Sequence, residues 1–516
     1  MQHGSYVREN FNKYHRMEFR PDISHLSENH VAALKILVRL GALMEKFLLR
    51  QVWSENEALL KKLQERNDQD ELAYFKFHMG PWEISPEVKA WRDDVPPSPP
   101  KGANFYPEDM TTEEFDTWVA TLTEEERRKA KGPFHVIRRG ADGRLLAVSY
   151  AEAYADILGP ASNLLEEAAE LIEDASLKTF LRKLAAAFLN NDFHSAEIAG
   201  MKVSPQAPFE INCIPKSPYL DRLYGTKGVI SFSVLVNDLE LNVMAANMLV
   251  YKGNIFNLFL LLNGALDSKR LFEKDSSMCV AYHEEPHEQA DENLPSRLVL
   301  IKNCLEAAFD KLAKVAEVIL VAEQSSLLKF LAYFLFVLMH EVGHANGPQY
   351  IAGSARVKIA EKLRDLHTSL DEAKADVSGM FGVKVLIQQG VITEASYEEM
   401  TIAYTVCIIT STLLGPDFAR GLGAIIELNY HMQHDAIIWD SGAKRFSIHF
   451  ERLSHSVESL VRDLMTMQAE GDLEAARAFV SKYGAKDIII IGIYSYVKDP
   501  TVQGLNKYEP YVLDVL

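Results

Sequence analysis

The chain has 516 residues, too many for one ordinary hydrophobic core, so we expect two large lobes or domains. Apolar residues make up 48% of the sequence and charged residues 24%, values typical of a soluble globular protein. The formal net charge is −18, and no basic stripe offsets it. Because binding to a phosphate backbone relies on clustered Lys and Arg, these features argue against a nucleic-acid partner.

Targeting and membrane segments are not expected. The N-terminal stretch is polar and lacks the continuous apolar region of a secretory signal. The longest apolar segment, LLKFLAYFLFVLM (327–339), is interrupted by Lys329 and has about half the length that a membrane span needs, so we expect a buried helix. The four cysteines lack CxxC spacing, which favours reduced thiols and a cytoplasmic location.

The first hundred residues are predicted to be mainly helical. Residues 29–65 carry apolar side chains at three- and four-residue intervals, the pattern of one or two amphipathic helices. Prolines and a glycine break all periodicity over 93–110, which predicts an extended connection or loop. The TTEEF stretch that follows predicts a helix start with Thr111 or Thr112 as its cap.

Strands are predicted in the middle and near the end of the chain. Two short apolar runs around GADG predict a hairpin over 133–149, and helical patterns resume over 150–192. Alternating and β-branched residues predict strands within 209–237. Nearly all of 240–480 has a helical pattern, whereas the tail 487–497 returns to strand composition.

These elements predict an α+β fold with two lobes. A mixed α/β lobe is expected to comprise residues 1–238 together with C-terminal strands in 481–516. A mostly helical lobe is expected to comprise residues 239–480, with a cleft between the two lobes. The sequence does not determine an oligomeric state.

The stretch FVLMHEVGHANGP (336–348) places two histidines four residues apart, with a glutamate after the first. Residues four apart share one face of a helix, so the imidazoles of His340 and His344 can converge on one zinc ion. Glu341 lies about 100° around the helix from His340, close enough to reach a metal-bound water without occupying a coordination position. The alternative is that these are merely polar residues ending a buried helix.

A candidate third ligand lies in a second helical pattern, over 367–387. Glu372 and Asp376 are four residues apart there and share one face. A glutamate would complete a zinc site of two histidines and one carboxylate, with a fourth position open for water as in zinc hydrolases. Asp376 could hydrogen-bond a ligand imidazole from one turn further along. The alternative is an acidic solvated face balanced by Lys374.

Together, HEVGHANGP and SLDEAKADVSG resemble the zinc-binding segments of dipeptidyl-peptidase-III-type metallopeptidases. The resemblance is greatest to the shorter bacterial proteins and to the similar region fused to a Nudix domain in plants. It extends to GPWEI (80–84), GANFYPEDMTTEEFDTW (102–118) and SPYLDRLYGTKGVISF (217–232), which occur in the order and approximate spacing of the family. It therefore covers the chain from about residue 30 to residue 480.

This resemblance implies roles for the residues of both segments. His340, His344 and Glu372 fall on the zinc ligands of the family. Glu341 falls on the general base that activates the zinc-bound water. The best-known members carry one extra residue between the two histidines, whereas this chain has the shorter HExxH spacing, so its helix needs no bulge there.

Other matching positions concern the oxyanion and the substrate. Tyr219 falls on a tyrosine that stabilises the oxyanion; the alternative is a partly buried aromatic residue beside a strand. His431 falls on a histidine with a similar task, with His434 as a rival assignment and a satisfied helix histidine as the alternative. Asp435 stands where those members have an arginine that helps to hold the peptide, which puts release of dipeptides in doubt. If residues 425–438 are helical, His431 and Asp435 share a face.

The sequence thus predicts a zinc-dependent peptidase whose helical lobe binds the metal. Zinc would polarise the scissile carbonyl, while Glu341 takes a proton from the bound water and delivers it to the leaving amine. Tyr219 and His431 would donate hydrogen bonds to the oxyanion. Two alternatives stay open: a zinc hydrolase of a non-peptide amide or ester, and a zinc-stabilised protein that binds an extended peptide without cutting it. Glu341 argues against the second, because binding alone needs no base.

Overall fold

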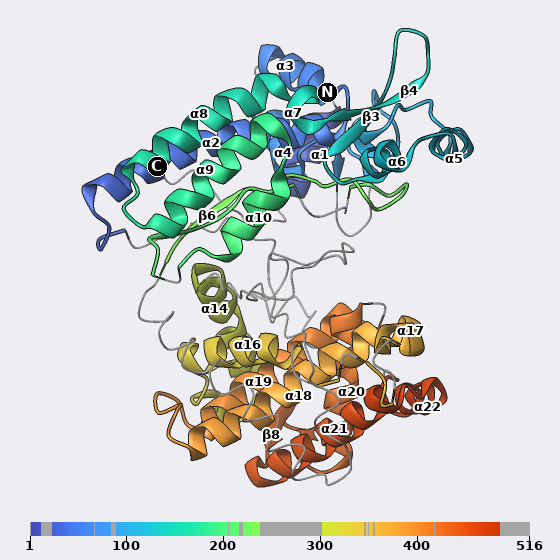
Figure 1. The fold of residues 1–516 in the computed structure, drawn as a ribbon. Helices are drawn as coiled ribbons and strands as arrows, with labels where there is room; N and C mark the ends of the chain where they lie inside the picture. Colours follow the sequence, from blue (N-terminus) through green and yellow to red (C-terminus); the bar gives the residue numbers. More distant parts are fainter. Residues whose placement is uncertain are drawn as a thin grey trace. The chain divides into compact units, whose positions relative to one another are not determined.

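The computed structural model describes residues 2–11, 23–237 and 302–485, apart from short gaps, which are 67, 84–88, 205, 216–219, 345–346, 349, 354–356 and 417. The chain divides into two compact units, which we call unit 1 (within residues 1–239) and unit 2 (within residues 240–506). Both contain many helices (Figure 1), and the described residues include three short antiparallel strand pairs in unit 1 and one in unit 2, which confirms the predicted α+β class. The cleft and the exact lobe boundaries stay predictions.

Unit 1 contains most of the strands found in the described residues. Its helices are α1 (Gln2–Phe11), α2 (Glu28–Val52), α3 (Asn56–Arg66), α4 (Gln69–His78), the 3-10 helix η1 (Ala103–Phe105), α5 (Thr112–Ala120), α6 (Glu124–Lys131), α7 (Tyr150–Ala153), α8 (Ala155–Leu171), α9 (Ala175–Asn190) and α10 (Phe193–Met201). Its antiparallel pairs are β1 (Trp82–Glu83) with β2 (Lys89–Ala90), β3 (His135–Arg139) with β4 (Leu145–Ser149), and β5 (Phe209–Asn212) with β6 (Ser233–Val236).

The core of unit 1 is built on the amphipathic helix α2. The Ser27 side chain caps its first turn by accepting from the backbone N–H of His30. Buried side chains recur at helical spacing, among them Leu37, Leu40 and Met44. This face packs against α8, and α8 in turn packs against α9, so that the three helices lie side by side (Figure 1). The one or two helices predicted over 29–65 are confirmed as α2 and α3.

Three further local predictions in unit 1 are confirmed. Thr111 caps α5 by accepting from the backbone N–H of Glu114. The GADG turn joins β3 to β4, and Gly143 has the positive φ of 79° that such a turn requires. The strands predicted within 209–237 are β5 and β6, paired with Phe209 opposite Val236.

The described residues of unit 2 are helical apart from one hairpin and the connecting turns. Its helices are α14 (Lys302–Ile319), α15 (Ala322–Ser325), α16 (Phe330–His344), α17 (Ile359–Leu363), the 3-10 helix η2 (Arg364–Leu366), α18 (His367–Gln388), α19 (Tyr397–Ser411), the 3-10 helix η3 (Thr412–Leu414), α20 (Ala419–Gln433), α21 (Phe450–Glu470) and α22 (Leu473–Tyr483). The hairpin pairs β7 (Ile437–Asp440) with β8 (Arg445–Ile448).

Helix α18 is the centre of unit 2, packed against α16, α19, α20 and α21. Most of its residues are buried, because its neighbours cover it on several sides. Small side chains such as Ala373, Ala375 and Gly379 let those neighbours approach. The buried helix predicted over 327–339 is confirmed as α16.

Two features of this region differ from what the sequence pattern suggested. The β7–β8 hairpin interrupts the stretch predicted to be helical, although IIWD and RFSI around DSGAK carried the signal of strands joined by a turn. Helix α20 ends at Gln433, and Asp435 has a left-handed φ of 50°, so Asp435 does not continue the helical face of His431. The tail 487–497 lies outside the described residues. Among the described helices, none is long and apolar enough to cross a membrane.

Candidate metal centre

Two glycines let α16 and α18 approach closely at the turn that carries the histidines. A β-carbon at Gly343 would lie 2.1 Å from the carbonyl oxygen of Ala375. A β-carbon at Gly379 would lie 2.6 Å from the carbonyl oxygen of Met339. Both distances are far below van der Waals contact, so neither position accepts a side chain without movement of the backbone. This contact brings Glu372 on α18 beside the histidines of α16.

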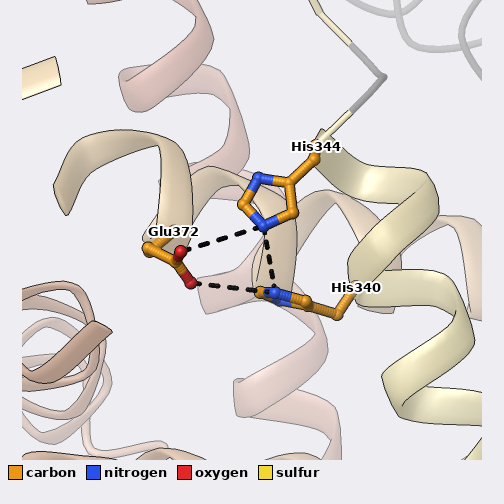
Figure 2. Close-up of side chains that lie close together, drawn as sticks. All are labelled: His340, His344 and Glu372. Atoms are coloured by element: carbon orange, nitrogen blue, oxygen red, sulfur yellow. Dashed lines mark hydrogen bonds and ion pairs between the residues drawn. The ribbon is translucent and has the colours of Figure 1, made fainter. Parts of the chain in front are cut away.

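His340, His344 and Glu372 converge, as Figure 2 shows. The Nε2 atoms of the two histidines are 3.1 Å apart. One carboxylate oxygen of Glu372 lies 3.7 Å from His340 Nε2, and the other lies 3.9 Å from His344 Nε2. In the described part of the chain, this is the group of histidine, cysteine and carboxylate side chains with the geometry to hold a metal ion.

Carboxylates fix the orientation of both imidazoles. His340 Nδ1 lies 2.6 Å from Asp376 Oδ1, and His344 Nδ1 lies 2.7 Å from Asp371 Oδ2. An ionised carboxylate can only accept, so each Nδ1 carries a proton, and in the neutral form of each imidazole Nε2 then carries a lone pair. The two lone pairs therefore face each other, an arrangement that a cation between them would stabilise.

The geometry fits a zinc ion. A tetrahedral zinc with bonds of about 2.0–2.2 Å holds its ligand atoms about 3.4 Å apart. The three separations here, 3.1, 3.7 and 3.9 Å, lie on either side of that value. Two imidazoles and one carboxylate also form a donor set of catalytic zinc sites, which keep a fourth position open.

A buried lysine stabilises the end of α16 next to this site. The Lys374 Nζ donates to the carbonyl oxygens of Gly343 and His344, at 2.9 and 3.0 Å, and lies 2.9 Å from Asp371 Oδ1. Although burial raises the pKa of Asp371, the charge of Lys374 and the bond to His344 outweigh it and hold that pKa well below its usual range. The solvated acidic face considered as an alternative is wrong, because Lys374 is 2% exposed.

An arginine, Arg420, pairs with two acidic residues of the site, Asp376 and Glu372. Arg420 lies 2.6 Å from Asp376 Oδ2 and 3.5 Å from Glu372 Oε2. Asp376 is completely buried, and burial raises its pKa, but the charge of Arg420 and the hydrogen bond from His340 bring the net pKa below the ordinary value. Asp376 therefore stays ionised as the acceptor for His340.

Glu341 follows His340 on α16 and is partly exposed. Within the described residues, its carboxylate forms no hydrogen bond or ion pair with another side chain. The general-base role of Glu341 stays a prediction.

The remaining predicted residues are placed differently. Tyr219 lies outside the described residues. His431 is completely buried, with Nε2 2.5 Å from the Tyr404 hydroxyl and Nδ1 2.7 Å from the Ser456 hydroxyl. His434 is exposed, and its ring stacks on that of Tyr430 with the ring centres 4.4 Å apart. Its Nδ1 is hydrogen-bonded to the backbone carbonyl oxygen of Tyr430. The roles implied for Tyr219, His431 and His434 stay predictions.

Two contributors to the site, Asp371 and Arg420, were absent from the sequence prediction. Asp371 directly precedes Glu372, so it could have been recognised as a second acidic residue beside the ligand. Arg420 is far from both ligand segments in sequence and carried no such local signal. Only the packing of α20 against α18 brings it to Asp376.

Comparisons with known proteins support the resemblance stated from the motifs. The structure of DPP III from Caldithrix abyssi matches with a TM-score of 0.84 and 28% identity, covering 97% of this chain and 99% of that one. The structure of dipeptidyl-peptidase III from Corallococcus sp. strain EGB matches with a TM-score of 0.74 and 27% identity, covering 98% and 97%. Nudix hydrolase 3 of Arabidopsis thaliana is 26% identical over 550 residues, which are 92% of this chain and 70% of that protein. No model of a protein family matches. The resemblance to the dipeptidyl-peptidase-III type is confirmed.

Proposed function

From its similarity to dipeptidyl peptidase III over nearly the whole chain, we propose that this protein is a zinc-dependent peptidase. The similarity supports a peptidase in general terms. The proposal that the activity depends on a metal is supported by the two Nε2 atoms, which lie 3.1 Å apart and face each other and the Glu372 carboxylate. The substrate class that we propose is peptides, and the proposed location is the cytoplasm.

His340, His344 and Glu372 would hold the ion. Zinc bound there would supply Lewis acidity, which polarises a carbonyl and acidifies water. Asp371 and Asp376 keep the Nδ1 protons in place, so that both Nε2 lone pairs remain available. Lys374 and Arg420 partly balance the negative charge of the three carboxylates.

Glu341 would act as the general base. Its carboxylate would take a proton from the attacking water and deliver it to the leaving amine. It is partly exposed, on the same turn as the two histidines. This role separates a peptidase from a protein that only binds peptides, since binding requires no base at that position.

For the oxyanion we propose Tyr219 as a donor, as the resemblance implies. The resemblance also gives His431 a stabilising role. His431 is buried, and its two ring nitrogens are hydrogen-bonded to Tyr404 and Ser456. We therefore propose that His431 acts indirectly, through these two side chains. Asp435 has no part in this proposal, since it lies beyond the end of α20 and does not share a helical face with His431.

The substitution Glu341→Gln tests the proposal. Zinc content, measured by elemental analysis, should match that of the wild type because the three ligands are intact. Hydrolysis of a fluorogenic peptide library should fall by about 10²- to 10⁴-fold, since the amide cannot accept the proton of water.

Glu398→Gln is the matched control, because Glu398 is an exposed glutamate in the first turn of α19. This variant should retain wild-type hydrolysis. Equal turnover in Glu341→Gln and wild type would show that another group is the base. Zinc in the wild-type protein without hydrolysis of any peptide, but with hydrolysis of esters or other amides, would identify a different substrate class.

A further inference from the structure

Two cationic side chains lie beside the metal centre, and their contacts differ. Lys374 is 2% exposed, and its Nζ has three partners, which are two backbone carbonyl oxygens at the end of α16 and the Asp371 carboxylate. An ammonium group has three N–H bonds, so this lysine has no donor left for a ligand. The side chain of Arg420, in contrast, is 25% exposed, and its contacts leave several of its donors unused.

A single nitrogen, Nη1, makes the contacts of Arg420. This atom lies 2.6 Å from Asp376 Oδ2, 3.5 Å from Glu372 Oε2 and 3.4 Å from His340 Nδ1. The other guanidinium nitrogens, Nε and Nη2, have no hydrogen-bond partner in the part of the chain that the structure describes. A guanidinium has five N–H bonds in one plane, and three of them belong to these two nitrogens. Arg420 thus contacts the metal centre at one end and has free donors at the other.

Close packing fixes the start of α20, which carries Arg420. A β-carbon at Gly421 would lie 2.0 Å from the carbonyl oxygen of Gly415, in the turn before the helix. A β-carbon at Gly423 would lie 3.2 Å from that of Glu372. The first turns of α20 are therefore held by the preceding turn and by α18, which carries Glu372. A donor on so fixed a backbone is preorganised, as stabilisation of a transition state requires.

The charges around the centre indicate what the free donors of Arg420 would bind. Four carboxylates lie at or beside the candidate ligands, on Glu341, Asp371, Glu372 and Asp376, together with the two cations. A bound divalent ion would balance these charges, so no surplus positive charge remains to hold an anionic group. A carbonyl oxygen is neutral in the bound substrate and becomes negative only as water adds to its carbon. A donor to that oxygen therefore acts on the transition state.

We propose that Arg420 is a catalytic residue that donates hydrogen bonds from Nε or Nη2 to the carbonyl oxygen of the scissile bond. The resemblance gives a similar task to His431, which lies eleven residues, or about three turns, further along the same face of α20. His431 is 0% exposed and both of its ring nitrogens are hydrogen-bonded, so it has no donor for a substrate. This role of Arg420 rests on the proposed function, because it concerns the bond that is cleaved at this centre.

The substitution Arg420→Lys tests the proposal without leaving the buried Asp376 unpaired. Lysine keeps the positive charge and can pair with Asp376 as Lys374 pairs with Asp371, but it lacks the second end of the guanidinium. Zinc affinity, measured by chelator competition, should match that of the wild type. The ratio kcat/KM for a fluorogenic peptide should fall by about 10²- to 10³-fold, the usual effect of losing one donor to an oxyanion.

Binding of a transition-state analogue gives a readout that does not depend on turnover. In a phosphinic peptide, a tetrahedral phosphorus with charged oxygens replaces the scissile carbonyl group. Its dissociation constant, measured by calorimetric titration, should rise in Arg420→Lys by the factor by which kcat/KM falls. The substrate peptide should bind to Glu341→Gln equally well with and without Arg420→Lys, because its carbonyl oxygen carries no charge.

Chemical modification of the wild-type protein gives a further measurement that needs no variant to fold. Phenylglyoxal modifies accessible guanidinium groups, and mass spectrometry of the digested protein identifies each modified arginine. The phosphinic peptide should protect Arg420 and leave Arg477 reactive, because Arg477 is an exposed arginine on α22, paired with Glu474 at 3.2 Å. Arg477→Lys is also the matched control for the variant and should keep wild-type zinc affinity, hydrolysis and analogue binding.

Three results would overturn the proposal. Unchanged kcat/KM and analogue affinity in Arg420→Lys, or modification of Arg420 that the analogue does not slow, would show that Arg420 does not contact the substrate. Loss of zinc affinity, with wild-type analogue binding at saturating zinc, would show that Arg420 only orients the ligands. A wild-type protein that neither cleaves nor binds any peptide would contradict the proposed function and this role together, whereas an active wild type with an unaffected variant contradicts the role of Arg420 alone.

Discussion

Asp371 and Asp376 occupy equivalent positions around the two ligand histidines, one for each imidazole. Both accept from Nδ1 at short distances, 2.7 and 2.6 Å. Their other contacts differ, since Asp371 is paired with Lys374 and Asp376 with Arg420. A charged partner on each carboxylate keeps it ionised, and an ionised carboxylate makes the imidazole a better donor of electrons to a metal.

Asp371→Asn should weaken zinc binding by about 10- to 100-fold, because a neutral amide holds the Nδ1 proton of His344 less strongly. The zinc dissociation constant, measured by competition with a chromogenic chelator, checks this. Asp365→Asn is the matched control, because Asp365 is an exposed acidic residue just before α18. An unchanged dissociation constant in Asp371→Asn would show that Asp371 does not tune His344.

At the scale of elements, the site depends on how closely α16 and α18 approach. The ligands come from both helices, and their separation is set where Gly343 and Gly379 face the backbone of the opposite helix. Packed interiors transmit such a constraint because they contain few voids. Helix period alone therefore places the ligands on the correct faces, whereas the glycines set the distance between the faces.

Gly379→Ala should destabilise the protein by about 1–3 kcal/mol, because the new methyl group overlaps the carbonyl oxygen of Met339 and separates the helices. Zinc affinity should fall as well, since Glu372 moves away from the histidines. Urea denaturation and chelator competition measure the two effects.

Gly159→Ala is the control for helical glycine substitution, because a β-carbon at Gly159 in α8 would have no atom within 4 Å. Its free energy of unfolding should change by no more than about 1 kcal/mol, because the helix preference of alanine is opposed by crowding of the new β-carbon against Pro160, and its zinc affinity should be unchanged. Wild-type stability and zinc affinity in Gly379→Ala would show that the helices are not held at this contact.

At the scale of the whole molecule, the candidate metal site lies within one of the two compact units. The three residues that could hold the ion all lie in unit 2. A ligand that binds only the folded state stabilises it by about 2.7 kcal/mol when its free concentration is 100 times the dissociation constant. The direct thermodynamic effect of zinc should therefore appear in the unfolding of unit 2.

Removing the metal should lower the unfolding temperature of unit 2 and leave that of unit 1 nearly unchanged. Four of the five tryptophans lie in unit 1, and Trp439 lies in unit 2, so fluorescence of a Trp439→Phe variant reports unit 1 alone. Chelator should shift a calorimetric transition without moving the fluorescence midpoint. His344→Ala, which lacks a ligand, should show no response to chelator; a response equal to that of the wild type would remove His344 from the site.

The sequence alone singled out His340, His344 and Glu372 as candidate metal ligands, because their positions depend on local spacing and helix period, and the structure brings the three together. It also determined α2, the β3–β4 hairpin and the cap of α5, each of which has a signal within a few residues. The hairpin β7–β8 carried a local signal too, which the surrounding helical pattern obscured.

Only the tertiary structure decided what surrounds those ligands. Arg420 reaches Asp376 across helix contacts, and Glu427, Tyr404 and His431 meet between α19 and α20. The reason is physical: the period of a helix assigns each side chain a face, but packing decides which face meets which. Whether His431 faces solvent or lies in a closed line of hydrogen bonds is thus fixed by neighbours that are distant in sequence.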